Sequence, residues 1–166
     1  MAEIEQALQD IIQRLGSKLK EKKEMLATAE SCTGGWVGQV ITSIPGTSHW
    51  YDRGFITYSN VAKREMLGVS TDTLARFGAV SEQTARAMAE GALQHSQARY
   101  TLSITGIAGP EGGTPDKPVG FVCFAWAGHN QETVSECLRF EGDRQQVRLQ
   151  AVQHALDGVA SYIDRP

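Results

Sequence analysis

The chain has 166 residues, 41% of them hydrophobic and 21% charged, which fits one globular domain over residues 1–166. Its formal net charge of −3 argues against a general nucleic-acid binder, which would carry a basic surface. No apolar run approaches the ~20 residues of a membrane span, and the acidic first ten residues do not resemble a signal peptide. We therefore expect a cytoplasmic domain that binds neither nucleic acid nor membrane.

Hydrophobic periodicity and chain-breaking residues predict helices interleaved with strands. The helices are expected over 3–22, 37–44, 59–67, 70–77, 81–92 and 143–163, and the strands over 25–29, 50–58, 100–105, 119–126 and 133–140. The last two strands flank Gly128-His129-Asn130, a predicted hairpin. This order predicts a single three-layer α/β/α domain with a mixed sheet of about five strands, because helices must cover the sheet. Ligands of such sheets bind in the loops that follow the carboxyl ends of strands.

The cysteines and histidines give no sign of a metal site. Cys32, Cys123 and Cys137 are odd in number and far apart, which predicts reduced thiols and no disulfide framework. The four histidines show neither HxxxH nor HExxH spacing. We therefore expect neither a metal nor a cofactor.

Glycine is over-represented, with 17 residues where average usage of about 7% predicts roughly 12. Part of the surplus lies at the first strand-to-helix junction, where Ser31 and Thr33 precede Gly34-Gly35. Glycines allow the backbone to approach a ligand, and a helix start offers unpaired N–H groups to an oxyanion or phosphate. The junction resembles a nucleophile elbow without the GxSxG pattern. The local pattern alone favours another interpretation, in which Ser31 or Thr33 caps the helix.

A second candidate loop contains Tyr58-Ser59-Asn60 and leads to Lys63 on the next helix. A lysine whose pKa is lowered by desolvation can deprotonate a serine, so Ser31 and Lys63 can form a catalytic pair. Most helix lysines are instead solvated surface groups. Cys32 is a rival nucleophile, although no histidine lies near it in the sequence and buried cysteines are usually inert.

Two further regions can bind a phosphate. The glycine-rich loop over 106–113 matches neither a Walker A loop nor GxGxxG, and it forms either a backbone cradle for a phosphate or ribose or a flexible connection with tight turns. Arg144 and Arg148 lie one helical turn apart and can grip a phosphate together. The alternative is a capped helix whose arginines pair with acidic residues.

Several motifs in order resemble the CinA C-terminal-domain family. They are Ala-Glu-Ser-Cys-Thr-Gly-Gly over 29–35, Gly-Phe-Ile-Thr-Tyr-Ser-Asn over 54–60 with Lys63, Gly-Ala-Val-Ser over 78–81, and Thr-Gly-Ile-Ala-Gly-Pro over 105–110 with Gly112-Gly113. The resemblance covers nearly the whole chain, and the stand-alone members of the family are nicotinamide-nucleotide amidases. It implies a homodimeric hydrolase that converts nicotinamide mononucleotide to nicotinic acid mononucleotide and ammonia, a step in pyridine-nucleotide recycling.

The resemblance also implies roles for individual residues. By position, Ser31 is the nucleophile, Lys63 is its base, and Tyr58 and Thr105 orient the pair or the substrate amide. Backbone N–H groups of residues 33–35 would hold the oxyanion, and the 106–113 loop or Arg144 would hold the phosphate. The expected substrate-binding residues are Glu30, Thr33, Gly34, Gly35, Asn60, Gly106, Gly109, Gly112, Gly113 and Arg144.

Two other classes of function stay open from the sequence. One is a non-catalytic nucleotide-binding protein associated with competence or DNA damage, which the joint presence of Ser31 and Lys63 disfavours. The other is an interaction module that uses the aromatic residues around His49-Trp50-Tyr51, unless those residues pack into the core at a strand edge.

Overall fold

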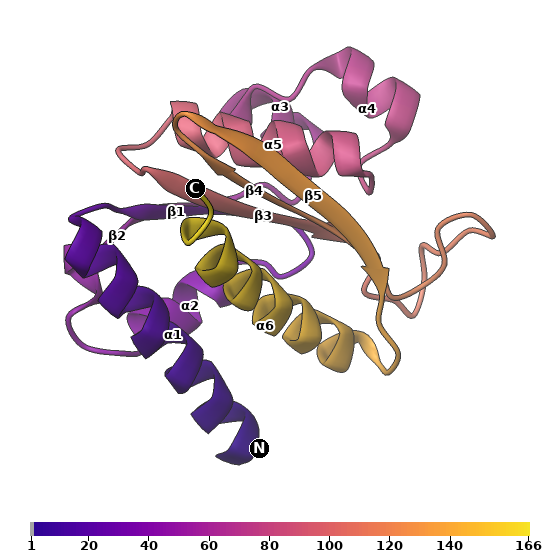
Figure 1. Ribbon diagram of the computed structural model, residues 1–166. Helices are drawn as coiled ribbons and strands as arrows, with labels where there is room; N and C mark the ends of the chain where they lie inside the picture. The colour runs from indigo at the N-terminus through magenta and orange to yellow at the C-terminus, as the bar shows by residue number, and fades with distance from the viewer. Residues whose placement is uncertain (1) are drawn as a thin grey trace.

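The computed structural model describes residues 2–166, and it confirms the predicted α/β class (Figure 1). One five-stranded sheet has the order β2-β1-β3-β4-β5. Helices α1, α2 and α6 cover one face of the sheet, and α3, α4 and α5 cover the other, which gives the three expected layers (Figure 1). Strand β1 pairs in parallel with β2 and β3, whereas β3, β4 and β5 are antiparallel to one another, so the sheet is mixed.

Each predicted helix and strand is present, with its ends shifted by two residues or fewer. In chain order the elements are α1 (Ala2–Lys22), β1 (Leu26–Glu30), α2 (Trp36–Thr42), a 3-10 turn (Thr47–His49), β2 (Tyr51–Ile56), α3 (Asn60–Leu67), α4 (Thr71–Phe77), α5 (Glu82–Gln94), β3 (Tyr100–Gly106), β4 (Phe121–Gly128), β5 (Gln131–Arg139) and α6 (Arg144–Ile163). The 3-10 turn alone was not predicted. Helix α6 begins with the expected capping box of Asp143 and Gln146.

The tryptophan directly before β2 belongs to the core. Trp50 is only 2% exposed and lies under α1, where a Cβ at Gly16 would stand 2.8 Å from the indole Nε1. Gly16 thus lets the helix backbone approach the indole closely. The alternative of core packing at a strand edge is confirmed for Trp50, because α1 covers its ring, whereas the neighbouring His49 is exposed.

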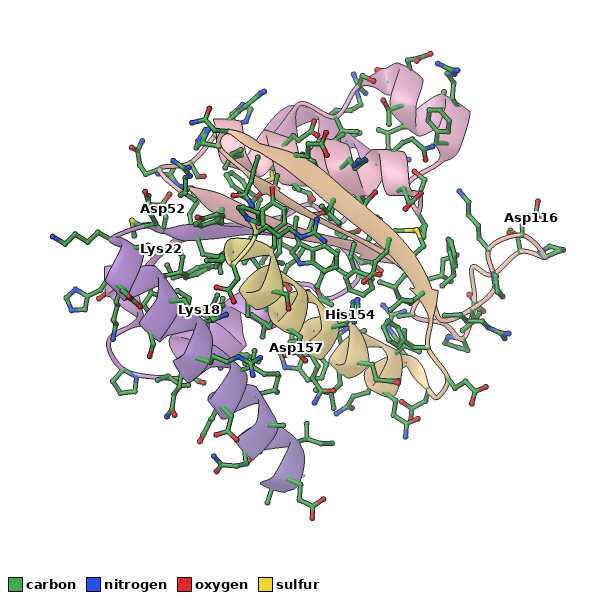
Figure 2. The ribbon with its side chains drawn as sticks, viewed as in Figure 1. Lys18, Lys22, Asp52, Asp116, His154 and Asp157 are labelled. Atoms are coloured by element: carbon green, nitrogen blue, oxygen red, sulfur yellow. A yellow bond between two sulfur atoms is a disulfide. The ribbon has the colours of Figure 1, made fainter. Side chains whose placement is uncertain are left out.

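The two cysteines of the last hairpin form a disulfide, so the prediction of reduced thiols is wrong for this pair. The antiparallel register of β4 and β5 sets Cys123 directly opposite Cys137, and the sulfur atoms are bonded, as the yellow bond in Figure 2 shows. They lie 14 positions apart in the sequence, but the chain between them runs along one strand and back along the next, which brings them together. Cys32 is the free cysteine of the described chain, and it is buried.

Across residues 2–166, no helix has the length and apolar character that a bilayer crossing requires.

The disulfide predicts a definite thiol count. The protein, purified without reductant and denatured in guanidinium, should show one thiol per chain with Ellman's reagent, and three after reduction. Cys137→Ser should raise the unreduced count to two, because it frees Cys123. Three thiols in the unreduced wild type would contradict the pairing.

Candidate active site

The junction between β1 and α2 brings Ser31 to the carboxyl edge of the sheet. Ser31 follows directly after β1, and its backbone N–H donates to the Ile104 carbonyl of β3, at 3.0 Å. The residue is 7% exposed, so its hydroxyl lies just below the surface. The parallel pairing of β1 with β3 therefore fixes where the hydroxyl stands.

Lys63 reaches Ser31 from the first turn of α3, with a side chain that is 1% exposed. Its Nζ lies 3.1 Å from Ser31 Oγ, 3.0 Å from the Thr57 carbonyl and 3.1 Å from the Tyr58 carbonyl. The Ser59 hydroxyl caps α3 and starts the helix at the point that lets Lys63 turn back toward β1. The structure thus brings the predicted pair together.

The surroundings of Lys63 suit a neutral amine. Burial lowers the pKa of Lys63 from its ordinary value of 10.5, and the nearby Cys32 opposes this only in part. As an ammonium, Nζ donates to all three oxygens. As an amine, it keeps its two bonds to the Thr57 and Tyr58 carbonyls and turns its lone pair toward the Ser31 hydroxyl. That is the arrangement of a general base beside a nucleophile.

The Glu30 carboxylate organises the turn after Ser31. It is 2% exposed and accepts from the Thr33 hydroxyl at 2.6 Å and from the backbone N–H groups of Val37 and Gly38 at 2.9 and 3.2 Å. The N-cap of α2 is Gly35, which provides no side-chain hydrogen bond. The interpretation of Ser31 or Thr33 as the cap is wrong, because the carboxylate at the end of β1 already satisfies the helix start.

Gly34 and Gly35 give the turn its shape. Their φ angles of +61° and +100° lie in the left-handed region, and a Cβ at Gly35 would stand 2.8 Å from Ile56 Cδ1. Within residues 2–166, the backbone N–H groups of Thr33 and Gly35 have no hydrogen-bond acceptor. The Cys32 N–H likewise has no acceptor in the described chain, so three backbone donors in the turn after Ser31 are free for a ligand.

Both arginines at the start of α6 point to this edge of the sheet. Arg148 donates to the Cys32 and Thr33 carbonyls at 3.0 and 3.2 Å. Arg144 donates to the Gly109 carbonyl at 2.8 Å, and its Nη2 lies 3.5 Å from the Tyr58 hydroxyl. Within the described chain neither arginine forms an ion pair, so the alternative of arginines paired with acidic residues is wrong.

The remaining predicted residues lie around the pair without joining it. The Thr105 hydroxyl, at the end of β3, donates to the Ala79 carbonyl at 2.7 Å, and the Tyr58 ring is 66% exposed, so that only its carbonyl meets Lys63. Asn60 is exposed on the first turn of α3. Gly106 ends β3, and Gly109, Gly112 and Gly113 lie in the loop that follows, which projects from the body of the domain at Asp116 (Figure 2).

Sequence reasoning missed the backbone partners of this site. The Thr57 and Tyr58 carbonyls that hold Lys63 carry no side-chain signal. Arg148 was weighed as a phosphate ligand, yet it binds the turn after Ser31. Its position four residues after Arg144 was the only signal available.

The Cys32 thiol is a poor nucleophile in this setting. Burial raises its pKa to about 12, an effect that the nearby Arg148 only partly offsets. The thiol therefore stays protonated at neutral pH, and the rival assignment to Cys32 loses support.

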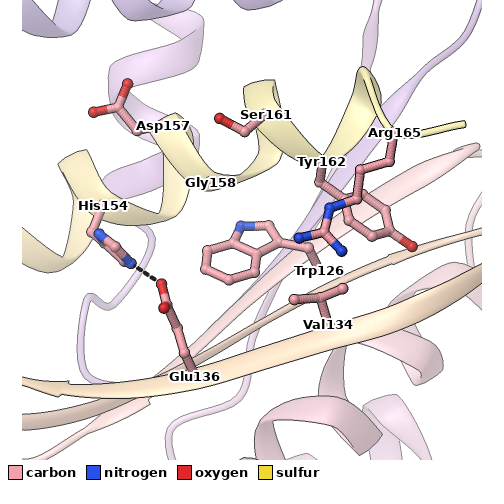
Figure 3. A pocket seen from close by; sticks show the side chains of 9 residues that line it. All are labelled: Trp126, Val134, Glu136, His154, Asp157, Gly158, Ser161, Tyr162 and Arg165. Atoms are coloured by element: carbon pink, nitrogen blue, oxygen red, sulfur yellow. Dashed lines mark hydrogen bonds and ion pairs between the residues drawn. The ribbon is translucent and has the colours of Figure 1, made fainter.

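Two observations bear on other ligands. Among residues 2–166, no three His, Cys, Asp or Glu side chains gather as a metal site would require. A pocket of about 310 Å³ lies between α6 and strands β4 and β5, where Trp126 forms part of the wall and His154 pairs with Glu136 (Figure 3). This pocket shares no residue with the site at Ser31.

Comparison with known proteins identifies the family of this chain. The family model of the CinA C-terminal domain matches residues 8–163. The chain belongs to this family. Nicotinamide-nucleotide amidohydrolase PncC of Escherichia coli K12 is 51% identical over 149 residues, which are 90% of each chain. A CinA-like protein of Syntrophobacter fumaroxidans is 51% identical over 142 residues, which cover 86% of this chain and 33% of that protein.

The solved structures show the same fold. The competence/damage inducible protein CihA of Agrobacterium tumefaciens superposes with a TM-score of 0.92 at 42% sequence identity, over 96% of each chain. This CinA C-terminal domain thus corresponds to a complete short protein in some relatives and to one third of a longer protein in others.

Proposed function

We propose that this CinA C-terminal domain is a nicotinamide-nucleotide amidohydrolase that converts nicotinamide mononucleotide to nicotinic acid mononucleotide and ammonia, a step in pyridine-nucleotide recycling. The observation that carries the proposal is the 3.1 Å contact between Ser31 Oγ and Lys63 Nζ at the buried end of β1. Support for the substrate comes from the name of the relative PncC, which matches over 90% of each chain.

Acylation follows from the pair. Neutral Lys63 takes the proton of Ser31 as Oγ attacks the amide carbon, and the carbonyl oxygen becomes an oxyanion. The free N–H groups of Thr33 and Gly35 are the donors for this oxyanion, each worth about 2.7–4 kcal/mol in comparable sites. The Thr57 and Tyr58 carbonyls stabilise the ammonium that Lys63 has become. Lys63 then returns the proton to the amide nitrogen, the C–N bond breaks, and ammonia leaves.

Deacylation uses the same groups in reverse. A water molecule gives a proton to Lys63 and attacks the acyl ester on Ser31. The ester bond breaks, Ser31 recovers its proton from Lys63, and the nicotinate carboxylate is released. Every proton is carried by a group of the chain or by water, so the reaction written here requires neither a metal nor a cofactor.

The nucleotide part of the substrate lies along the neighbouring loops in this proposal. Arg144, which spans Gly109 and Tyr58, is the phosphate ligand, and the 106–113 loop lies beside it. Asn60, exposed on the first turn of α3, is a further contact for the nucleotide in this proposal. Glu30 and Thr105 have their polar atoms engaged with the protein and act as positioning residues. The homodimer implied by the resemblance stays a prediction.

Loss of either member of the pair should abolish turnover. Ser31→Ala should lower kcat for ammonia release from nicotinamide mononucleotide by roughly 10³-fold or more, and Lys63→Met by about 10²- to 10⁴-fold. Ser17→Ala and Lys18→Met are matched controls that should keep the rate, because both residues lie on α1. Unchanged rates in the Ser31 and Lys63 variants, loss of the wild-type rate in EDTA, or nucleotide binding without turnover would contradict the mechanism.

The dependence of kcat/KM on pH should reveal the pKa of the general base, Lys63. Only neutral Lys63 accepts the serine proton, so kcat/KM should rise with pH through the Lys63 pKa and then level off. Because burial disfavours the ammonium, the midpoint should lie below 10.5. Initial rates between about pH 6 and pH 10, with the fold checked by circular dichroism at each pH, measure the midpoint. A rate that falls with rising pH over this range would speak against a lysine base.

Arg144 should act on the phosphate. Arg144→Ala should raise KM for nicotinamide mononucleotide by about tenfold or more, because a charge-assisted contact is lost. It should leave kcat/KM for nicotinamide riboside, which has no phosphate, unchanged. Arg165→Ala, two residues beyond the far end of α6, is the control for loss of a positive charge. Equal losses on both substrates would show that Arg144 acts through the loop and not on the phosphate.

A further inference from the structure

We propose that Arg148 is a positioning residue, which aims the backbone N–H of Thr33 at the oxyanion formed on the substrate. The inference rests on the proposed function, because it requires an amide-cleaving site at Ser31. Arg148 lies outside every motif that carries the family resemblance, and it makes its contacts with the turn across more than 110 residues of sequence.

The first observation is that one guanidinium holds two successive carbonyls of an irregular turn. Nε of Arg148 donates to the Cys32 carbonyl at 3.0 Å, and Nη2 donates to the Thr33 carbonyl at 3.2 Å. The guanidinium is planar and its donors form a rigid fork. Two peptide planes of the turn are therefore fixed at once.

The second observation concerns the direction of the free donors. In a trans peptide the carbonyl and the following N–H point in opposite directions. Since the Cys32 carbonyl points to Arg148, the Thr33 N–H points away from it, and it has no acceptor in the described chain. The next N–H, that of Gly34, is already bonded to the Ser31 carbonyl at 3.1 Å. Of these two N–H groups, the one free for an oxyanion is the one that Arg148 directs.

The guanidinium itself is held in place. Its Cζ lies 5.2 Å from the centre of the Trp36 ring, at the start of α2, in a cation–π contact. On the other side of the turn, the Glu30 carboxylate binds the Thr33 hydroxyl. The turn ends in two glycines with left-handed φ angles, residues that restrict the backbone little, so the contacts with Arg148 and Glu30 hold the turn in one conformation.

This role predicts a specific kinetic defect. The oxyanion exists only in the transition state and the tetrahedral intermediate, so a misdirected Thr33 N–H should lower kcat and leave substrate binding nearly intact. A phosphate ligand would give the opposite pattern, a raised KM with little change in kcat.

The test compares Arg148→Ala and Arg148→Lys with Arg86→Ala. Arg86 is a matched control, because its guanidinium also donates to a backbone carbonyl, that of Thr133 at 2.8 and 3.0 Å, but on the α5–β5 side. In steady-state ammonia release, both Arg148 variants should lose about 10- to 100-fold in kcat, with KM within about threefold. Arg148→Lys should retain more rate than Arg148→Ala, and added methylguanidinium should restore part of the rate of Arg148→Ala only.

Three results would overturn the positioning role: kcat within about twofold of wild type in both folded variants, a rise in KM without loss of kcat, or an equal loss of kcat in Arg86→Ala. Thermal unfolding of each variant separates loss of fold from loss of rate. If Arg148→Ala does not fold, Arg148→Lys carries the comparison. Lack of turnover by the wild-type protein would overturn the proposed function, whereas an active wild type with unaffected Arg148 variants would overturn only this inference.

Discussion

A lysine nitrogen removed from water must find its acceptors inside the protein, and the site is arranged around this need. Lys63 Nζ finds two carbonyls in the segment after β2 and one hydroxyl after β1. These acceptors lie near one another because β2 ends at Ile56. The next residue, Thr57, then donates its N–H to the Glu30 carbonyl at 2.8 Å, which joins the ends of β1 and β2. The Ser59 cap then starts α3 within reach of Nζ. One arrangement of the strand ends thus buries the Lys63 amine, which lowers its pKa, and sets Nζ beside the Ser31 hydroxyl.

The turn between β1 and α2 is held from several directions. Glu30 accepts hydrogen bonds from the Thr33 hydroxyl of the turn and from a backbone N–H at the start of α2. Arg148 donates to two carbonyls of the same turn. The backbone groups of the turn that keep no partner are N–H donors, which can bind the oxyanion of a tetrahedral intermediate. Such a site needs little reorganisation when charge develops, because its dipoles are already oriented by contacts that exist without substrate.

The sequence predicted what local patterns control. Apolar spacing and caps placed each helix and strand, whereas Ser31 and Lys63 were singled out by the family resemblance, because their local patterns alone favoured a helix cap and a solvated lysine. It failed where tertiary packing decides. The disulfide depends on the register of β4 against β5, and the burial of Trp50 depends on the path of α1. The contact of Arg148 with Cys32 depends on how α6 docks, and no neighbouring residue in the chain encodes it.

Arg144 and Arg148 stand four residues apart on α6, and each holds a different loop of the site. A helix rises 1.5 Å per residue, so about 6 Å of rigid backbone sets the spacing between the loop at Gly109 and the turn at Cys32. The first turns of α6 therefore fix the distance between the two loops of the site. Inserting or deleting one residue there would rotate one arginine by about 100° relative to the other, whereas the exposed loop around Asp116 can change in length without disturbing this spacing. Variation in length among related chains should accordingly concentrate in that loop and avoid the start of α6.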